Sequence, residues 1–189
     1  STASGKTLIF TTVATQSLTL DDATRVLALY PARALIQDQL EKWRAALSPF
    51  GFRAEIIDGG VPVPTRAAIL EVSQVVLMTP DVAHAWLLAH IGEREIARFL
   101  DHLGLLVLDE AHVYDGVFGT NMAYFRRRLD VGARARFRLI ATTATLGQPA
   151  EFIERLTGRP VFAIESDGEG SPAPRRTVLL VNGIDRRAF

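Results

Sequence analysis

The sequence predicts an α/β fold in which a mostly parallel sheet is sandwiched by helices. Segments with strand-like apolar runs alternate in strict order with segments of helical periodicity through most of the 189 residues. The strand-like runs are apolar throughout, which is typical of strands that are buried on both faces of a parallel sheet. No long stretch lacks predicted structure, so helices are expected to connect one strand to the next.

The first half of the chain opens with a helix that ends in a turn at Asp21 and Asp22. Pro31 stops the strand that follows, because proline lacks the N–H group that a sheet ladder needs. The next helix carries apolar residues at helical spacing, from Leu35 to Leu47. In this half the expected helices are residues 7–18, 34–47 and 65–72, and the expected strands are residues 25–30, 52–57 and 74–78.

The second half continues the alternation up to Gly158 and Pro160, which close the last helix. A polar Gly/Pro segment at residues 167–174 is expected to form a surface loop between two strand-like runs. We therefore expect one domain over residues 1–183 and the start of a linker at residues 184–189. The expected helices are residues 82–91, 93–102, 119–129 and 150–156, and the expected strands are residues 104–108, 137–141, 161–164 and 177–181.

Composition narrows the classes of protein without choosing one. The 21 basic residues are balanced by 21 acidic ones, so any nucleic-acid contact must be local rather than a basic coat. The sequence has no cysteine, which excludes a disulfide or a cysteine-based zinc site within it. No apolar stretch has transmembrane length and no secretory leader is visible. We expect a cytoplasmic protein with no membrane contact.

Ser4-Gly5-Lys6-Thr7 has the form of the end of a phosphate-binding loop, Gly-x-x-x-x-Gly-Lys-Ser/Thr. In such a loop backbone N–H groups wrap the phosphates, the lysine neutralises charge and the threonine hydroxyl reaches Mg²⁺. The helix that follows would aim its N-terminus at the phosphates. The first glycine of the pattern, and the strand before it, would lie ahead of residue 1. We interpret the chain as a fragment of a longer protein.

Asp109-Glu110-Ala111-His112 directly follows the apolar run at residues 104–108. A buried strand that ends in adjacent carboxylates can hold Mg²⁺ with the first and activate a water molecule with the second. Either motif alone would be a weak signal. Together, and in this order, they predict a site that binds and hydrolyses a nucleoside triphosphate.

Polar or turn-forming stretches also follow the other expected strands. Because ligands of parallel sheets collect at the carboxyl ends of the strands, these stretches are candidates for one continuous site. They occupy residues 31–35, 58–60, 79–81, 109–112 and 142–145. In this order they resemble the motifs of the first RecA-like motor domain of superfamily 2 helicases of the DEAH type, a P-loop NTPase fold. The resemblance spans essentially the whole chain.

Two longer stretches, residues 30–39 and 109–119, are similar to DNA-repair helicases of the MrfA/YprA-like group. Residues 126–129, and 167–168 leading into 171–172, fit the same group. The resemblance implies 3′-to-5′ translocation on single-stranded DNA, with ATP and Mg²⁺ as cofactors. It also implies a second RecA-like domain of the same parent chain as a partner.

Carried over by position, the resemblance assigns three sets of residues. For the nucleotide it implies that phosphates and Mg²⁺ are bound by Ser4, Gly5, Lys6 and Thr7, with Asp109 at the metal and Glu110 on the attacking water. For coupling to the second domain it implies His112, Thr143 and Thr145, with Thr143 standing where the family has serine. For the nucleic-acid strand it implies Arg33, Gln37, Gly59, Gly60, Arg66, Thr79 and Asp81.

The chemistry of the last set supports a strand-binding role independently. A motor that moves along any sequence has to grip phosphates through backbone N–H, hydroxyl and arginine groups rather than read base edges. Gly59 and Gly60 would let the backbone approach a strand closely.

Other conspicuous residues are interpreted as structural. We expect Trp43 and Trp86 in the core and the run Arg126–Arg128 on a solvated helix face or domain contact. The histidines expected at the surface or in helix packing are His84, His90 and His102.

Three alternatives remain open at this point. An RNA helicase or RNA-dependent ATPase would differ mainly in contacts to the 2′-hydroxyl. A duplex translocase without strand separation would look the same over these residues. A scaffold that binds a nucleotide without hydrolysing it is disfavoured, since a site that no longer catalyses hydrolysis need not keep Lys6, Asp109 and Glu110. Without a second domain we expect this chain to hydrolyse ATP barely or not at all.

Overall fold

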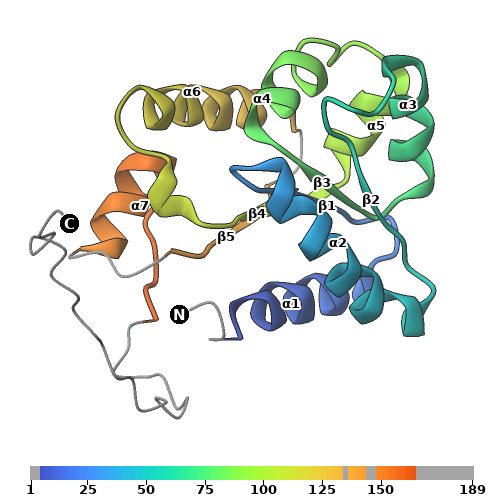
Figure 1. The fold of residues 1–189 in the computed structure, drawn as a ribbon, viewed down its shortest axis with the longest axis horizontal. Coiled ribbons are helices and arrows are strands. Elements are labelled where there is room, and N and C mark those ends of the chain that lie inside the picture. Colours follow the sequence, from blue (N-terminus) through green and yellow to red (C-terminus); the bar gives the residue numbers. More distant parts are fainter. Residues whose placement is uncertain (1–4, 134–135, 144–147, 165–189) are drawn as a thin grey trace, which may run out of the picture.

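The computed structural model describes residues 5–133, 136–143 and 148–164, and its centre is one parallel sheet (Figure 1). Five strands lie in the order β2-β3-β1-β4-β5, and all four strand pairs are parallel. The predicted α/β class and parallel sheet are confirmed. The strands are β1 Arg25–Leu29, β2 Ala54–Ile56, β3 Val75–Met78, β4 Leu103–Leu108 and β5 Arg138–Ala141.

Helices connect the strands in the predicted order, with boundaries that differ by a few residues. The α-helices are α1 Lys6–Leu20, α2 Arg33–Leu47, α3 Val63–Val72, α4 Pro80–Val82, α5 Arg94–Asp101, α6 Gly116–Gly132 and α7 Pro149–Thr157. Short 3₁₀ turns occur at η1 Ser48–Phe50 and η3 Ala111–Val113. Helix α6 is longer than predicted because it starts directly after Asp115, whose side chain accepts a hydrogen bond from the Gly116 amide at 2.7 Å.

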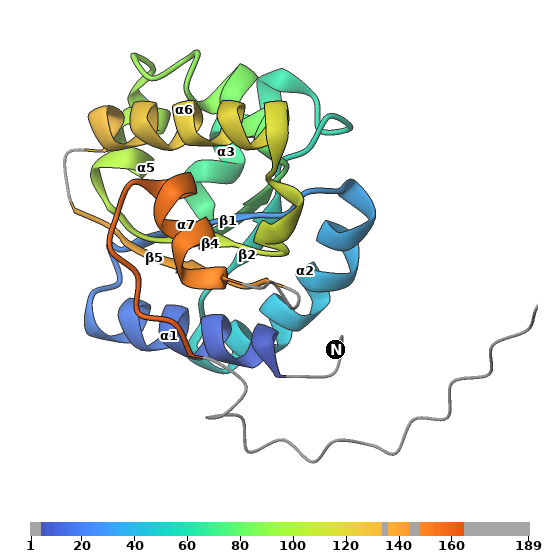
Figure 2. The same ribbon diagram turned by 90° about the vertical axis from the view of Figure 1, so that its left-hand side faces the viewer.

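The helices cover both faces of the sheet, with α1 and α2 on one side and α3, α5 and α6 on the other (Figure 2). Successive residues of a strand point to opposite faces. In β1, Val26 and Ala28 therefore pack with α1 and α2, whereas Leu27 and Leu29 pack with the opposite layer. Both predicted core tryptophans are buried, Trp43 in the first layer and Trp86 in the second.

Strand β5 lies at one edge of the sheet and pairs only with β4 among the described residues. Its side chains are half-buried or exposed, whereas those of the central strand β1 are almost all buried.

Two sequence-based predictions were wrong. The helix expected at residues 82–91 is a short α-helical turn, α4, followed by the π-helical turn η2 Ala83–Leu87, in which the Leu88 amide donates to the Ala83 carbonyl at 3.1 Å. The strand expected at residues 161–164 is not formed, and Phe162 is 91% exposed. Apolar, β-branched composition favours a strand only where a partner strand is available. The strand expected at residues 177–181, the Gly/Pro loop and the linker lie outside the described residues.

The arginine run at the end of α6 is only partly solvated. Arg126 is buried, donates to the Thr157 carbonyl and pairs with Asp130, which also pairs with Arg159 at 2.8 Å. Burial lowers the pKa of Arg126, and Asp130 opposes this effect. Arg126 therefore joins α6 to the end of α7, a role that differs from the predicted solvated face. Within the described part, no helix combines the length and apolar character that a membrane span requires.

Candidate active site

The carboxyl ends of the strands form a single edge, and the polar residues predicted from the sequence stand on it. The sheet hydrogen bonding continues just past the strands. The Tyr30 amide donates to Met78, Asp109 to Leu29 and Thr142 to Leu108, at 2.9–3.0 Å. Asp109 and Thr142, which follow neighbouring strands, are thereby held at the same level.

Asp109 is a nearly buried carboxylate, 8% exposed. Its Oδ1 atom accepts hydrogen bonds from the Thr142 hydroxyl and from the Glu110 amide, the latter at 3.0 Å. A carboxylate with one oxygen fixed by two donors has a defined orientation and keeps its second oxygen for other ligands.

Glu110 has a left-handed backbone with φ of 49°, and it is the one non-glycine residue with positive φ in the described chain. The turn is held by two backbone bonds, from the Ala111 amide to the Thr142 carbonyl at 2.7 Å and from the Val113 amide to the Glu110 carbonyl at 3.0 Å. The Glu110 Oε2 atom lies 3.2 Å from His112 Nδ1, and both side chains are about one-third exposed. The turn thus leaves the Glu110 side chain partly exposed to solvent and places it beside His112, the predicted coupling residue.

Lys6 and Thr7 lie at the start of α1, after Gly5, whose φ of 69° is readily available only to glycine. The Lys6 ammonium donates to the Thr143 carbonyl at 2.7 Å. The Thr7 hydroxyl donates to Gln39 Oε1 at 3.1 Å. The structure therefore brings the lysine that is predicted to bind phosphate to the end of β5. Ser4 and Thr145 lie outside the described residues.

Two tyrosines stand close behind Asp109. Trp43 Nε1 donates to the Tyr30 hydroxyl at 2.9 Å, whereas the buried Tyr114 hydroxyl has no hydrogen-bond partner in the described structure. Burial raises the pKa of Tyr30, the Trp43 bond partly opposes this, and the Asp109 carboxylate raises the pKa further. Burial and Asp109 likewise raise the pKa of Tyr114. Both hydroxyls therefore stay neutral.

The residues predicted to contact a nucleic-acid strand follow β1, β2 and β3 along the same edge, except Arg66, which lies in α3. Arg33, Gln37, Gly59, Gly60 and Asp81 are exposed, while Thr79 is buried at the start of α4. Arg66 is also buried and donates to the Val61 carbonyl at 3.0 Å and the Asp58 carbonyl at 3.2 Å. Because Arg66 is buried beneath the loop residues that it binds, it is poorly placed for a direct phosphate contact.

Three residues of this edge were not singled out from the sequence. Gln39 receives the Thr7 hydroxyl, Thr142 holds Asp109, and Asp58 contacts Arg33. Gln39 is a single polar residue within a helix, and Thr142 lies in a threonine-rich stretch. No motif spacing identifies either of them as a site residue. Asp58 directly precedes two glycines, a common turn sequence, so the sequence does not distinguish it from an ordinary loop residue.

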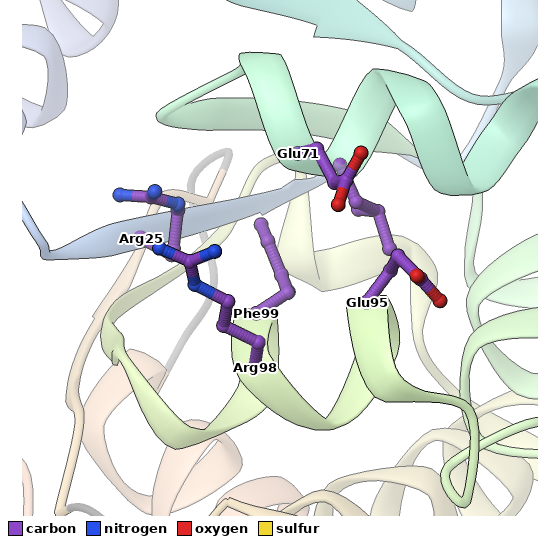
Figure 3. Close-up of a pocket in the computed structure, with 6 residues that line it drawn as sticks. Arg25, Glu71, Glu95, Arg98 and Phe99 are labelled. Atoms are coloured by element: carbon purple, nitrogen blue, oxygen red, sulfur yellow. The ribbon is translucent and has the colours of Figure 1, made fainter.

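Two hollows elsewhere in the structure are distinct from this edge. A cavity of about 20 Å³ lies at the opposite end of β1, where Arg25 and Arg98 face one side and Glu71 and Glu95 the other, with Phe99 between them (Figure 3). It has room for about one water molecule. A larger groove of about 250 Å³ between the start of α6 and α7 is lined by Tyr114, Gly119 and Arg155, among others. Neither hollow is lined by Lys6, Asp109 or Glu110.

The donor set at the edge fits a nucleotide with Mg²⁺ rather than a protein-only metal cage. In the described residues, no three His, Cys, Asp or Glu side chains are grouped as metal ligands. Magnesium is commonly held by one or two protein oxygens together with substrate phosphates and water. The free oxygen of Asp109 and the Thr7 hydroxyl supply such protein oxygens, and Lys6 supplies a compensating charge for phosphates.

Comparisons with known proteins agree with this chemistry. A DEAD/DEAH box helicase family model matches residues 1–153. The ATP-dependent helicase YprA of Bacillus subtilis is 32% identical over 96% of this chain and 24% of its own length. The ATP-dependent helicase Hrq1 of Schizosaccharomyces pombe is 30% identical over 84% of this chain and 15% of its own length.

Solved structures show the same fold. The DUF1998 helicase MrfA bound to DNA superposes with a TM-score of 0.79 and 34% identity, covering 84% of this chain and 22% of that one. MrfA bound to DNA and AMPPNP gives a TM-score of 0.79 at 28% identity, covering 88% of this chain and 24% of that one. The chain therefore spans about a quarter or less of the length of each of these relatives. It belongs to the DEAD/DEAH box helicase family, as a first RecA-like domain of the MrfA/YprA-like kind.

Proposed function

We propose that this chain is the N-terminal motor domain of a helicase that couples ATP hydrolysis to 3′-to-5′ movement along single-stranded DNA during DNA repair. One observation carries the proposal. Lys6 is hydrogen-bonded to Thr143 at the end of β5, and Asp109 and Glu110 follow the neighbouring strand β4, on the edge of the sheet that also presents Arg33 and the Gly59–Gly60 loop. A change of nucleotide state at one part of this edge can therefore reach the strand-binding part over a short path.

At the nucleotide, each residue has a distinct task. Lys6 neutralises phosphate charge, and the Gly5 turn lets backbone N–H groups approach the phosphates. Asp109 and Thr7 would hold Mg²⁺, which when bound neutralises charge on the phosphate oxygens. Glu110, on its outward turn, orients and deprotonates the attacking water.

Coupling to the strand-binding residues would run through the end of β5. The Lys6 ammonium donates to the Thr143 carbonyl, and because it has three N–H donors it could bind a phosphate at the same time, which would link the phosphate directly to the end of β5. The buried Thr143 hydroxyl also has no partner among the described residues. Thr143, together with Thr145 and His112, is therefore proposed to report nucleotide binding to a second RecA-like domain.

The proposed parent protein is longer than this chain. We propose that residues 1–183 form the first motor domain and that residues 184–189 begin the linker to the second. In related NTPases an arginine supplied by a second element is worth about 10³- to 10⁵-fold in rate. We therefore expect the isolated chain to hydrolyse ATP barely or not at all and not to unwind duplexes.

The testing experiment is ATP hydrolysis by the full-length protein, alone and with matched single-stranded DNA or RNA. We expect stimulation by DNA but not by RNA. Lys6→Ala should weaken nucleotide binding, whereas Glu110→Gln should retain binding and abolish hydrolysis. Lys42→Ala is the matched control, since Lys42 lies on the exposed side of α2 and pairs only with Asp38 there.

Each other outcome has a defined meaning. Equal or RNA-selective stimulation would replace the DNA assignment by an RNA-dependent one. Binding without turnover under any condition would leave a nucleotide-binding scaffold. The MrfA structures bound to DNA favour DNA over RNA. Translocation on strands labelled at either end tests the direction, and faster arrival at the 3′ end would contradict it.

A further inference from the structure

A buried carboxylate joins the two loops that the proposed function assigns to the DNA strand. Asp58 follows β2 and is 4% exposed. Its Oδ2 atom accepts a hydrogen bond from Arg33 Nε at 2.9 Å, and its Oδ1 atom accepts one from the Gly60 amide at 2.8 Å. One side chain thus connects the first residue of α2 with the loop after β2.

The backbone of Asp58 is fixed as firmly as its side chain. Its carbonyl accepts hydrogen bonds from the Val61 amide at 3.1 Å and from Arg66 Nη2 at 3.2 Å. The Arg66 guanidinium lies 5.5 Å from the centre of the Trp86 ring, which places it under the loop. The loop is therefore held from behind, and Asp58 cannot shift without breaking several contacts.

Arg33 is presented to solvent by this arrangement. Its side chain is 63% exposed although its Nε atom is bound to Asp58, so much of the guanidinium remains accessible to a ligand. Gly60 leaves the space that the guanidinium occupies, since a Cβ atom there would lie 2.7 Å from Arg33 Nη2. A long exposed arginine normally samples many conformations, and binding a ligand then costs entropy. Fixing it in advance lowers that cost.

We propose that Asp58 is a positioning residue that holds Arg33 and the Gly59–Gly60 loop in the geometry that grips a phosphate of single-stranded DNA. The proposal rests on the proposed function. Asp58 itself does not touch the strand and acts through Arg33.

The direction of the change in DNA affinity on neutralising Asp58 distinguishes a positioning role from a purely electrostatic one. A carboxylate close to a phosphate site repels the phosphate, so neutralising it should strengthen DNA binding if charge alone matters. Positioning predicts the reverse, because an unfixed Arg33 makes a weaker contact.

The experiment compares the full-length protein with its Asp58→Asn variant, using fluorescently labelled oligo-dT and DNA-stimulated ATP hydrolysis. Asparagine keeps the acceptor for the Gly60 amide and removes the ion pair. We expect single-stranded DNA affinity to fall about three- to tenfold, as for loss of one charge-assisted contact. The slope of log affinity against log salt should fall by about 0.7, the value for one phosphate contact on a single strand. ATP hydrolysis without DNA, and kcat at saturating DNA, should not change.

Two further variants show whether the effect passes through Arg33. In an Arg33→Ala background, Asp58→Asn should cause no additional loss of affinity. Gly60→Ala should reproduce the loss without removing the Asp58 carboxylate, because its Cβ would lie 2.7 Å from Arg33 Nη2 and displace the flexible end of that side chain, with a looser 3.2 Å contact to Asp58 Oδ1. Glu55→Gln is the control, since it breaks the exposed 2.7 Å ion pair with Arg44 that also joins β2 to α2.

Unchanged or tighter DNA binding by a folded Asp58→Asn protein would overturn the proposal, as would an equal further loss in the Arg33→Ala background. If Asp58→Asn does not fold, Gly60→Ala provides the test, and unchanged DNA binding by Gly60→Ala would also overturn the proposal. If the wild-type protein bound no single-stranded DNA, the proposed function itself would fail and this proposal with it. That result is distinct, because it appears before any substitution is made.

Discussion

Replacing Gly119 by alanine should destabilise the protein although the position lies within a helix. Gly119 is in the first turn of α6, directly after the turn that carries the acidic motif. A Cβ atom there would lie 2.5 Å from the Tyr114 carbonyl oxygen and 3.0 Å from its carbon. Both are backbone atoms, so no side-chain rotation can relieve the contact. The backbone between Tyr114 and Gly119 would have to move.

The magnitude follows from two opposed effects. Overpacking of this kind costs typically about 1–3 kcal/mol. Alanine is favoured over glycine in a helix interior by about 1 kcal/mol. We therefore expect a net loss of roughly 0–2 kcal/mol in the free energy of unfolding. Since Tyr114 follows the turn that holds Glu110, we also expect kcat for ATP hydrolysis to fall.

Denaturant unfolding of the purified protein, with ATP hydrolysis measured in parallel, is the assay. Gly132→Ala in the same helix is the matched control, because its Cβ would meet the flexible end of Ile91, at 2.3 Å from Cδ1, rather than backbone. We expect Gly132→Ala to be tolerated far better. Equal stability of the two variants, or a stabilised Gly119→Ala protein, would refute the steric reasoning.

Three further predictions concern single side chains. Thr142→Val removes the hydroxyl that orients Asp109 and should lower kcat about tenfold, a loss of about 1.4 kcal/mol, while Thr142→Ser keeps activity. Burial would raise the pKa of Asp58, but hydrogen bonds from the Gly60 amide and the neighbouring guanidinium outweigh it and lower the pKa below its usual value. The stability that wild type gains over Asp58→Asn should hold above about pH 4 and vanish as pH falls through the lowered pKa. A constant difference in unfolding free energy down to pH 2 would contradict this. Glu110→Asn should be more stable than Glu110→Gln by about 0.5–1 kcal/mol, since asparagine tolerates a left-handed backbone better. Equal unfolding midpoints would show that the turn carries no strain.

The alternation of strands and helices was predictable because the buried strands are apolar runs in the sequence and the amphipathic helices carry apolar residues at helical spacing. The predicted helix at residues 82–91 failed at the π-helical turn Ala83–Leu87, where packing against the sheet overrides propensity. The strand predicted at residues 161–164 failed because pairing depends on a neighbouring strand, which a local pattern does not report. Within the site, the residue types at the strand ends were predictable, since the edge of a parallel sheet collects them whatever their exact register.

Side-chain partners were the part that the sequence could not supply. Arg66 and Arg126 are charged and looked exposed, yet both are buried against backbone carbonyls contributed by other segments. Conversely, Asp58 looked like one acidic residue in a loop. Such assignments depend on which carbonyls and carboxylates the fold brings within 3 Å, and no periodicity encodes that.

The backbone at Glu110 shows how the fold can impose a geometry that local preference opposes. A left-handed conformation costs a non-glycine residue about 1–2 kcal/mol, and sequence preference alone would place glycine or asparagine there. The cost is met by the Ala111 and Val113 backbone bonds, which fix the turn from β5 and from η3. Glutamate stands at that position although glycine or asparagine adopts this conformation at lower cost. A strained backbone of this kind is expected where a side chain serves chemistry rather than folding, and it fits the proposed role of Glu110 as the base that activates water.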